Sequence, residues 1–468
     1  MIATTTGRVS GLDNDTVFKG IPYAKTPFGP LRLAAPAPVE PWDGVFEATA
    51  FGPRPPQPAM PGGAPAWDPA GGLDCLTLNV WTPDKDGAGL PVMVWIYGGA
   101  YITGSTDVPE YDGTLLAAEG VVVVTVNYRV GFEGFGHVEG APPNRGLLDQ
   151  VAALRWVRDN VGAFGGDPGN VTVFGESAGA GSIAALLAMP SAAGLFRRAI
   201  LQSVPGTFFS PAYAARVSAA ILGGASPYEL EPLELVERVE EFRAAMDGAH
   251  AEWGPLAFTP TPFSPVVDGV VLPDTPWNAL ADGASSDVDV IVGFNRDEFR
   301  LFTMMSGKPG DLALALKELA PPGADVVYRT AHPQADNDQL YELLLGDWLF
   351  RMPSATLADL HTGPTFAYEL TWDAPALGAC HGLDVPLTFG TLDGMMGQLL
   401  THGAPEGPEI SVQIRRAWTR FAATGNPGWP VYEPVAAITH LFDVEPKDVS
   451  DPEAASRALW SAPGFPVL

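Results

Sequence analysis

Residues 171–182, which read VTVFGESAGAGS, constrain the fold of this chain more than any other stretch. A β-branched run leads into the pattern Gly-x-Ser-x-Gly, and a small-residue, apolar segment follows as far as Pro190. This is the strand, tight turn and helix context in which a serine sits on a strained elbow with its hydroxyl exposed. Gly175 and Gly179 allow strand and helix to approach closely, because a Cβ at either place would crowd the turn. The pattern alone is weak in a chain rich in Gly, Ala and Ser, but its context favours Ser177 as a nucleophile over a plain strand-to-helix connection.

Beyond residue 90 the chain alternates between strand-like and helix-like segments. Strands are expected at residues 91–97, 121–127, 171–174, 289–292 and 365–370, and helices at 149–161 and 410–423. In both helices apolar residues recur every three to four positions, as on the buried face of an amphipathic helix. This alternation predicts an α/β fold with a mostly parallel central sheet and helices on both faces.

Two segments depart from the alternation. Residues 51–72 are dense in Pro and Gly and are expected to form a long irregular loop. Residues 227–254 are rich in Glu with apolar residues at helical spacing, which predicts either a helix inserted over the mouth of the sheet or a solvated surface helix. We expect one domain over residues 1–468, with a small helical insertion at about 207–255 over the functional site.

Composition argues against several classes of protein. Hydrophobic residues make up 46% of the 468 residues and charged residues 17%, which suits a large core and not a disordered chain. The 54 acidic and 26 basic residues give a net charge of −28, which argues against nucleic acid or an anionic membrane surface as a partner. We interpret the charge as promoting solubility, with attraction of cationic substrates as the alternative. No apolar run approaches the roughly 20 residues of a membrane span.

The cysteines and the start of the chain indicate a compartment. Cys75 and Cys380 are too few for a disulfide scaffold and are expected to be buried thiols in a reducing environment. The first residues contain no apolar signal-peptide core. The expectation is a soluble, cytoplasmic protein.

A serine nucleophile needs a base, and the base needs a third group to orient it. Histidine suits the role because its pKa lies near neutrality. Of the seven histidines, His381 lies in the loop after the last predicted strand, where the α/β hydrolases place their base, and His402 is the second candidate. The acid is expected in the loop after the 289–292 strand, where Asp297 and Glu298 both qualify and spacing does not choose between them.

Amide donors are expected beside the serine, because attack on a carbonyl places negative charge on its oxygen. The loop Gly98-Gly99-Ala100 follows a strand and offers backbone amides without bulky side chains. Ala178, at the start of the helix after the serine, offers another amide and the positive end of the helix dipole.

Further motifs occur along the chain in order. They are GIPYA at 20–24, DCLTLNVW at 74–81, WIYGGAY at 95–101, NYR at 127–129, NRGLLDQ at 144–150 and FGGDP at 164–168. Together with the elbow, these motifs make nearly the whole chain resemble the type-B carboxylesterases, the cholinesterase-like branch of the α/β hydrolases. The similarity in style is closest to the bacterial carboxylesterases.

The resemblance implies an α/β-hydrolase fold and specific roles for several residues. It implies a catalytic triad of Ser177, Glu298 and His381 and oxyanion amides at Gly99, Ala100 and Ala178. It also implies an open site that accepts bulky alcohol groups, and a structural ion pair between Arg129 and Asp149. No metal or cofactor is expected.

The chain departs from the family at several points. The disulfide partner of Cys75 is missing, and Leu73 stands where a glutamate usually pairs with an arginine, here Arg32. Trp67 lies near the position of the cation-binding tryptophan of cholinesterases, although the local spacing differs. The chain is also shorter than most relatives, chiefly in its middle, which implies a reduced lid and a more open pocket.

The expected function is hydrolysis of small-molecule carboxylic esters through an acyl-enzyme, with short-chain acyl groups and small aromatic or bulky alcohols. The expected apolar pocket wall consists of Tyr101, Phe208, Phe209, Leu301 and Phe302, for each of which a place in the ordinary core is the alternative. Alternative functions are a non-catalytic binding module, a lipase, and an amide or carbamate hydrolase. No oligomeric state follows from the sequence. Activity is expected to fall as pH drops through about 6–7, because the base must be neutral.

Overall fold

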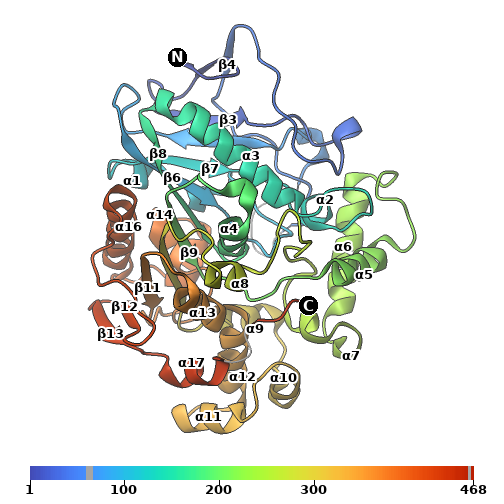
Figure 1. The fold of residues 1–468 in the computed structure, drawn as a ribbon, viewed down its shortest axis with the longest axis vertical. Helices are drawn as coiled ribbons and strands as arrows, with labels where there is room; N and C mark the ends of the chain where they lie inside the picture. The colour runs from blue at the N-terminus through green and yellow to red at the C-terminus, as the bar shows by residue number, and fades with distance from the viewer. Residues whose placement is uncertain (60–66, 462–464) are drawn as a thin grey trace.

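The structure is a computed structural model that describes residues 1–59, 67–461 and 465–468 (Figure 1). Residues 60–66 of the expected irregular loop lie outside the described residues. The rest of that loop contains only a short 3₁₀ turn at Pro69–Gly71.

A ten-stranded sheet, in the order β13-β12-β11-β10-β9-β8-β6-β7-β5-β3, forms the centre of the molecule. Its strands are β3 (Val17–Pro22), β5 (Thr77–Trp81), β6 (Leu90–Ile96), β7 (Val122–Val126), β8 (Gly166–Glu176), β9 (Arg198–Gln202), β10 (Asp289–Asn295), β11 (Thr365–Leu370), β12 (Ile438–Phe442) and β13 (Lys447–Ser450). The seven neighbouring strands β7, β6, β8, β9, β10, β11 and β12 pair in parallel. At the two edges of the sheet, β5, β3 and β13 pair antiparallel with their neighbours. A separate small sheet contains β1 (Ile2–Ala3), β2 (Arg8–Ser10) and β4 (Val45–Glu47). The predicted mostly parallel sheet is confirmed.

Helices surround the sheet (Figure 1). They are α1 (Thr114–Ala117), α2 (Gly131–Phe135), α3 (Arg145–Asn160), α4 (Ala178–Ala188), α5 (Pro211–Leu222), α6 (Pro232–Met246), α7 (His250–Trp253), α8 (Pro276–Ala281), α9 (Arg300–Ser306), α10 (Leu312–Glu318), α11 (Ala324–Ala331), α12 (Asn337–Gly346), α13 (Met352–Leu360), α14 (Asp384–Phe389), α15 (Met395–Thr401), α16 (Gly407–Thr424) and α17 (Ala454–Trp460). A π-helical turn, Asp347–Arg351, joins α12 to α13.

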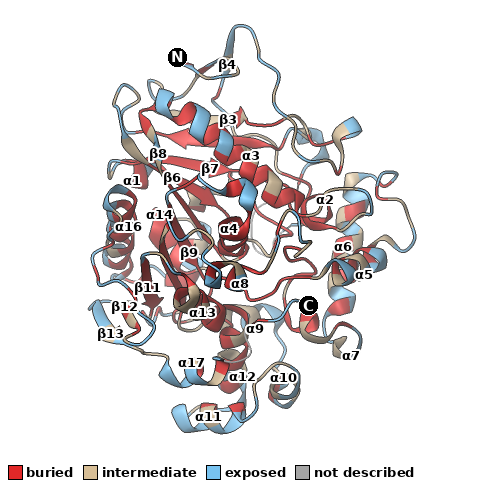
Figure 2. Cartoon of the chain, in the orientation of Figure 1, coloured by how far each residue is buried: buried red, intermediate tan, exposed pale blue. Residues whose placement is uncertain are grey.

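The two faces of the sheet are covered by different helices. Successive residues of a strand point to opposite faces. Gly175 of β8 faces α4, because a Cβ there would lie 3.1 Å from the Ile183 side chain. Phe174 points to the other face and packs on Phe389 of α14, with ring centroids 5.8 Å apart. Figure 1 shows α3 on the side of α4, and α16 beside α14. Figure 2 shows the strands buried and the exposed residues on the outer sides of the helices.

Predicted boundaries agree best where the apolar pattern is regular. Helix α16 buries the apolar residues that its spacing predicts, and it ends at Gly425. Helix α3 begins four positions before the predicted start at Asp149. Its first residue, Arg145, is buried and donates hydrogen bonds to four backbone carbonyls, at 2.7–2.9 Å. The spacing of apolar residues cannot predict a helix start that depends on the hydrogen bonds of a buried arginine.

The chain between β9 and β10 contains the helices of the predicted insertion. Helix α6 buries Leu235, Val239, Phe242 and Met246 and packs against α5 and α2. Its Glu-rich face is exposed or partly exposed. None of the helices in the described part of the chain combines the length and apolar character that crossing a bilayer requires.

Buried ion pairs hold the first half of the chain together. Arg129 and Asp149 form the expected pair, with both side chains fully buried and two N–O contacts of 2.7 Å. Arg32 pairs with Glu133 at 2.6 Å. The family's missing glutamate at position 73 is therefore replaced by a partner from α2, far along the chain.

Breaking the buried pair at α3 is expected to destabilise the protein. In Asp149→Asn the Arg129 guanidinium stays buried without a countercharge, and the free energy of unfolding should fall by about 3–5 kcal/mol. Urea unfolding followed by circular dichroism measures this change. Asp159→Asn, which breaks an exposed pair with Arg158, is the control and should cost about 0–1 kcal/mol. Equal effects in the two variants would contradict the prediction.

Candidate active site

Ser177 lies on a sharp turn between β8 and α4. Its backbone has φ 56° and ψ −124°, a conformation that costs a non-glycine residue about 1–3 kcal/mol. The turn needs glycine on either side. A Cβ on Gly175 would lie 2.5 Å from the Ile96 carbonyl oxygen, and one on Gly179 would lie 2.0 Å from the same atom. Strand β6, strand β8 and helix α4 thus approach one another at a distance that only glycine allows.

His381 follows β11 and contacts Glu298, which follows β10. The two loops are joined by a parallel bridge between Asp297 and Cys380. Nδ1 of His381 lies 2.6 Å from Oε2 of Glu298. Both side chains are buried, with exposed fractions of 6% and 1%. This contact fixes the ring orientation and leaves Nε2 as the nitrogen directed toward the elbow.

Glu298 has two further partners that hold its carboxylate in place. The hydroxyl of Ser203 donates to Oε1 at 2.5 Å, and the backbone amide of Asn295 donates to the same oxygen at 2.9 Å. Ser203 follows β9, between the strands that deliver the serine and the acid. Ser203 was not among the residues predicted from the sequence. Its only signal in the sequence is its position directly after the strand that adjoins the elbow.

The imidazole of His381 lies against the elbow itself. Its Nε2 is 3.1 Å from Oε1 of Glu176, the residue that precedes Ser177. Among the described residues, no group accepts a hydrogen bond from the Ser177 hydroxyl. The rings of Phe350 and Phe302 cover the imidazole, with centroids 4.3 Å and 5.1 Å away. The imidazole is thus enclosed by two aromatic rings and by the carboxyl groups of Glu176 and Glu298.

The buried charges perturb both titrating groups. Burial raises the pKa of Glu176 to about 8, against the opposing effect of the nearby imidazole. Burial by itself would lower the pKa of His381, but the carboxylates of Glu176 and Glu298 raise it to about 9. Burial also raises the pKa of Asp384, which accepts a hydrogen bond from the Gln202 amide at 2.6 Å. The base is therefore held among carboxylates that favour its protonated form.

Backbone amides converge near Ser177. Gly98 lies against the serine, since a Cβ there would be 3.0 Å from the Ser177 Cβ. The loop continues with Gly99 at φ 120° and Ala100 at φ 56°. Among the described residues, the amides of Gly99, Ala100 and Ala178 donate to no protein acceptor. Three backbone donors in the segments around Ser177 are thus free for a ligand.

The alternatives left open by the sequence lie elsewhere. Asp297 binds the guanidinium groups of Arg296 and Arg300, at 2.9 and 3.0 Å, and accepts from the Ala379 amide. His402 is exposed at the end of α15. Of the two acids and the two leading histidines, only Glu298 and His381 contact each other.

The residues predicted for the pocket wall fall into two groups. Leu301 and Phe302, on α9, are partly exposed, and Phe302 contacts His381. Phe208 and Phe209 are buried against Trp277 and Tyr213. Tyr101 is buried against Phe135, with its hydroxyl directed at Gly181. A role in substrate binding stays a prediction for all five. Phe350, on the π-helical turn, was not predicted.

Two features outside the site bear on earlier expectations. Trp67 is buried, and its indole N–H has no partner in the described part of the chain. The sequence left open whether Trp67 forms a cation site, and the residues directly before it lie outside the described residues. Cys75 and Cys380 are free and buried, as expected.

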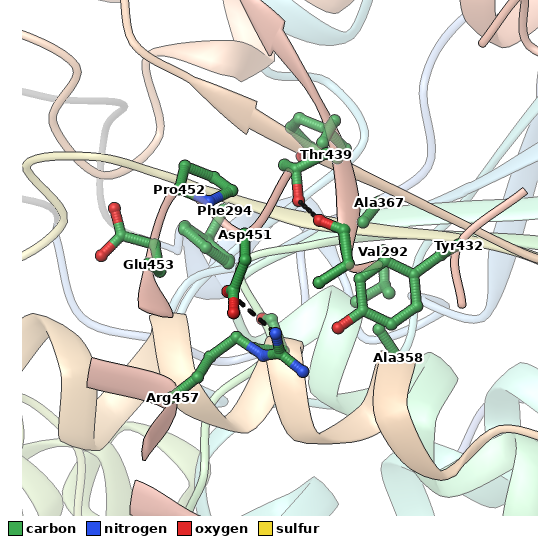
Figure 3. A pocket seen from close by; sticks show the side chains of 14 residues that line it. Val292, Phe294, Ala358, Ala367, Tyr432, Thr439, Asp451, Pro452, Glu453 and Arg457 are labelled. Atoms are coloured by element: carbon green, nitrogen blue, oxygen red, sulfur yellow. Dashed lines mark hydrogen bonds and ion pairs between the residues drawn. The ribbon is translucent and has the colours of Figure 1, made fainter. Parts of the chain in front are cut away.

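Two cavities in the described part of the chain are not lined by Ser177, Glu298 or His381. The cavity in Figure 3 lies between the sheet and helices α13 and α17, and its lining includes Tyr432 and the ion pair of Arg457 with Asp451 at 2.8 Å. A larger cavity, of about 450 Å³, is lined by three arginines, each paired with a carboxylate. The candidate active site is defined by convergent side chains and amides, not by either cavity.

Comparison with known proteins gives consistent matches over most of the chain. The model of the carboxylesterase family matches residues 1–318. The para-nitrobenzyl esterase of Bacillus subtilis (strain 168) is 40% identical over 98% of this chain and 97% of its own, and the phenmedipham hydrolase of Pseudarthrobacter oxydans is 36% identical over 92% of each. A solved structure of PNB esterase superposes with a TM-score of 0.86 at 37% identity, over 98% of both chains. A carboxylesterase of Geobacillus stearothermophilus gives 0.86 at 37%, over 98% of this chain and 99% of its own.

The reactivity of Ser177 is expected to depend on pH through the carboxylate at 176. A protonated imidazole cannot accept the serine proton, so the raised pKa of His381 moves the half-maximal pH above 7, higher than the 6–7 predicted from the sequence. Glu176→Gln removes one of the two carboxylates and should lower that pH by about one unit or more. The pH dependence of p-nitrophenyl acetate hydrolysis measures the shift.

Asp448→Asn is the control for this experiment, because it removes an equal charge from an exposed acid paired with His440. It should leave the pH profile unchanged. An identical profile for wild type and Glu176→Gln would show that the carboxylate does not act on the base.

Proposed function

Because this chain belongs to the carboxylesterase family and hydrolyses carboxylic esters, we propose that Ser177 is its nucleophile, His381 its general base and Glu298 the acid that orients the base. The observation that carries the proposal is the 2.6 Å contact between His381 and Glu298, with Nε2 of the imidazole at the serine elbow. A base oriented by a buried acid beside a strained serine is the arrangement that acyl transfer requires.

The reaction begins with attack by the Ser177 hydroxyl on the ester carbonyl. His381 takes the hydroxyl proton on Nε2 as the bond to the carbonyl carbon forms. This step requires a hydrogen bond from the hydroxyl to Nε2, and such bonds are often long in free enzymes and tighten when substrate binds. Glu298 stabilises the imidazolium that results, and Ser203 and Asn295 keep its carboxylate aligned.

The amides of Gly99, Ala100 and Ala178 stabilise the oxyanion of the tetrahedral intermediate. Their lack of protein acceptors supports this role, because a donor already paired within the protein is not available to the substrate. The positive end of the α4 dipole adds to the stabilisation at Ala178.

The intermediate then collapses and releases the alcohol. His381 donates the proton from Nε2 to the leaving oxygen, and the acyl group stays on Ser177 as an ester. Water repeats the sequence: His381 takes its proton, the hydroxide attacks the acyl-enzyme, and the serine oxygen leaves with the proton. The products are a carboxylic acid, an alcohol and the free enzyme.

The preferred substrates are esters with short acyl chains and small aromatic or bulky alcohols. The positions of Phe302 and Phe350 support the preference for short acyl chains, because their rings occupy the space beside the imidazole. We include Tyr101, Phe208, Phe209 and Leu301 in the substrate pocket. The chain forms one domain, and its helical insertion at about 207–255 covers the site without closing it.

We propose that the protein acts in the cytoplasm on small molecules. Its two buried, free thiols support a reducing compartment. Its net charge of −28 supports the absence of nucleic acid and anionic membranes among its partners.

Loss of the nucleophile is expected to abolish turnover. Ser177→Ala should lower kcat/KM for p-nitrophenyl acetate by at least about 10³-fold, because the amides alone retain only a small part of the acceleration. An organophosphate should label wild type at one residue per chain and leave Ser177→Ala unlabelled, as mass spectrometry of the intact chain measures. Ser182→Ala is the control: Ser182 lies on α4, after the motif, and its hydroxyl accepts a hydrogen bond from Gln150, so this variant should label fully. An unlabelled wild type would indicate a binding module in place of an enzyme.

A series of esters of increasing acyl length tests the preference for short acyl chains. The acetate and butyrate p-nitrophenyl esters should exceed the dodecanoate by more than about tenfold in kcat/KM. Phe302→Ala enlarges the space beside His381 and should narrow that ratio. An emulsified triglyceride and an anilide, assayed in parallel, test lipase and amidase activity. A preference for the dodecanoate or the triglyceride would contradict the proposal.

A further inference from the structure

Two successive non-glycine residues in the oxyanion loop adopt left-handed backbone conformations. Ala100 has φ 56° and Tyr101 has φ 61°. Each such residue is strained and persists only where its surroundings determine its conformation. The contacts that impose this conformation therefore also determine where the loop's amides point.

The carbonyls of Gly99, Ala100 and Tyr101 each have a donor. The Gly99 carbonyl accepts from the backbone amides of Ile102 and Thr103, both at 3.0 Å, so it is held within the loop. The Tyr101 carbonyl accepts from the Gly131 amide at 2.7 Å, at the start of α2. The Ala100 carbonyl, between them, accepts from the side-chain hydroxyl of Thr261. That third donor comes from 161 positions along the chain.

Thr261 is itself oriented by its own segment. Its side chain is buried, with an exposed fraction of 7%. The backbone amide of Phe263 donates to its oxygen at 3.1 Å, and the Thr259 hydroxyl donates to its carbonyl at 2.9 Å. The Thr261 hydroxyl has one proton to donate, and two carbonyls lie within reach of it. The Phe263 carbonyl is 3.2 Å away, and the Ala100 carbonyl is nearer. The hydroxyl proton is therefore directed at Ala100.

The segment that carries Thr261 ends the helical excursion of α5, α6 and α7. A bridge between Phe209 and Val266 closes this excursion at its base, with the Phe209 amide donating to the Pro265 carbonyl at 2.9 Å. Thr261 therefore bonds the segment that follows the helical insertion to the oxyanion loop.

We propose that Thr261 is a positioning residue that sets the oxyanion amides through the Ala100 carbonyl. The inference rests on the proposed function, because those amides matter only if Ser177 forms an acyl-enzyme. Without the hydroxyl the partly buried Ala100 carbonyl is unpaired, and the strained peptide can rotate away from the direction that the transition state needs. The ground-state ester depends little on this alignment, so the effect falls on kcat and not on KM.

Thr261→Val removes the hydroxyl at almost constant volume and tests the proposal. We expect kcat for p-nitrophenyl acetate to fall by about ten- to hundredfold, less than the loss of a whole donor, with KM within about threefold. An aryl trifluoromethyl ketone, to which Ser177 adds to give a hemiketal oxyanion, should bind more weakly by the same factor as the loss of kcat. Thr261→Ser keeps the hydroxyl and should stay within about threefold of wild type in both measurements.

Thr207→Val is the matched control. Thr207 is buried, and its hydroxyl bonds Ser264 at 2.9 Å, so this variant also loses a buried hydroxyl contact to the segment but none to the oxyanion loop. Its kcat and ketone affinity should match those of wild type. If Thr261→Val does not fold, as thermal unfolding reports, Thr261→Ser against Thr261→Ala makes the same comparison.

The outcomes separate this inference from the proposed function. A wild type that neither turns over esters nor reacts with an organophosphate overturns the proposed function. An active wild type with unchanged kcat and ketone affinity in Thr261→Val overturns the role of Thr261 alone. An equal loss in Thr261→Ser and Thr261→Val assigns the effect to packing of the methyl group and also overturns it.

Discussion

The carbonyl of Ile96 occupies a space between Gly175 and Gly179 where no Cβ fits, and the rest of the site depends on this close approach. It brings the end of β6, the end of β8 and the start of α4 to one point. The loop after β6 can then present its amides to the residue that begins the turn into α4. A bulkier residue at either glycine would separate the amides from Ser177 by more than catalysis allows, because misplacement by about 1 Å already costs about 100-fold in rate.

Around this point, parallel strands deliver one group each. The carboxyl ends of β6, β8, β9, β10 and β11 lie along one edge of the sheet and lead to the oxyanion loop, Ser177, Ser203, Glu298 and His381. Neighbouring strands lie about 4.8 Å apart, which is within reach of hydrogen-bonded side chains. The sheet therefore sets the distances between these groups, and the loops set only the final orientation of each group.

Buried charged groups in the first half of the chain have specific partners. Arg129 and Asp149 neutralise each other, whereas Arg145 relies on four backbone carbonyls. At the proposed base the balance differs. His381 lies between the carboxylates of Glu298 and Glu176, which favour its charged form, the form that the proposed mechanism requires in the transition state. The neutral form of His381, which the proposed mechanism requires at the start, is therefore populated only at higher pH.

The sequence alone determined the sheet, the elbow and the order of the groups, because β-branched runs, amphipathic spacing and glycines at a tight turn are local signals. It predicted α16 from its apolar spacing, and it selected Ser177, His381 and the acidic pair of Asp297 and Glu298 by their places after strands. Only the tertiary structure decided which acid contacts the base, that Ser203 supports it, that Arg32 pairs with Glu133, and that Thr261 reaches Ala100. These contacts join residues 83 to 161 positions apart or depend on the rotation of one side chain, and neither property leaves a periodic pattern in the sequence.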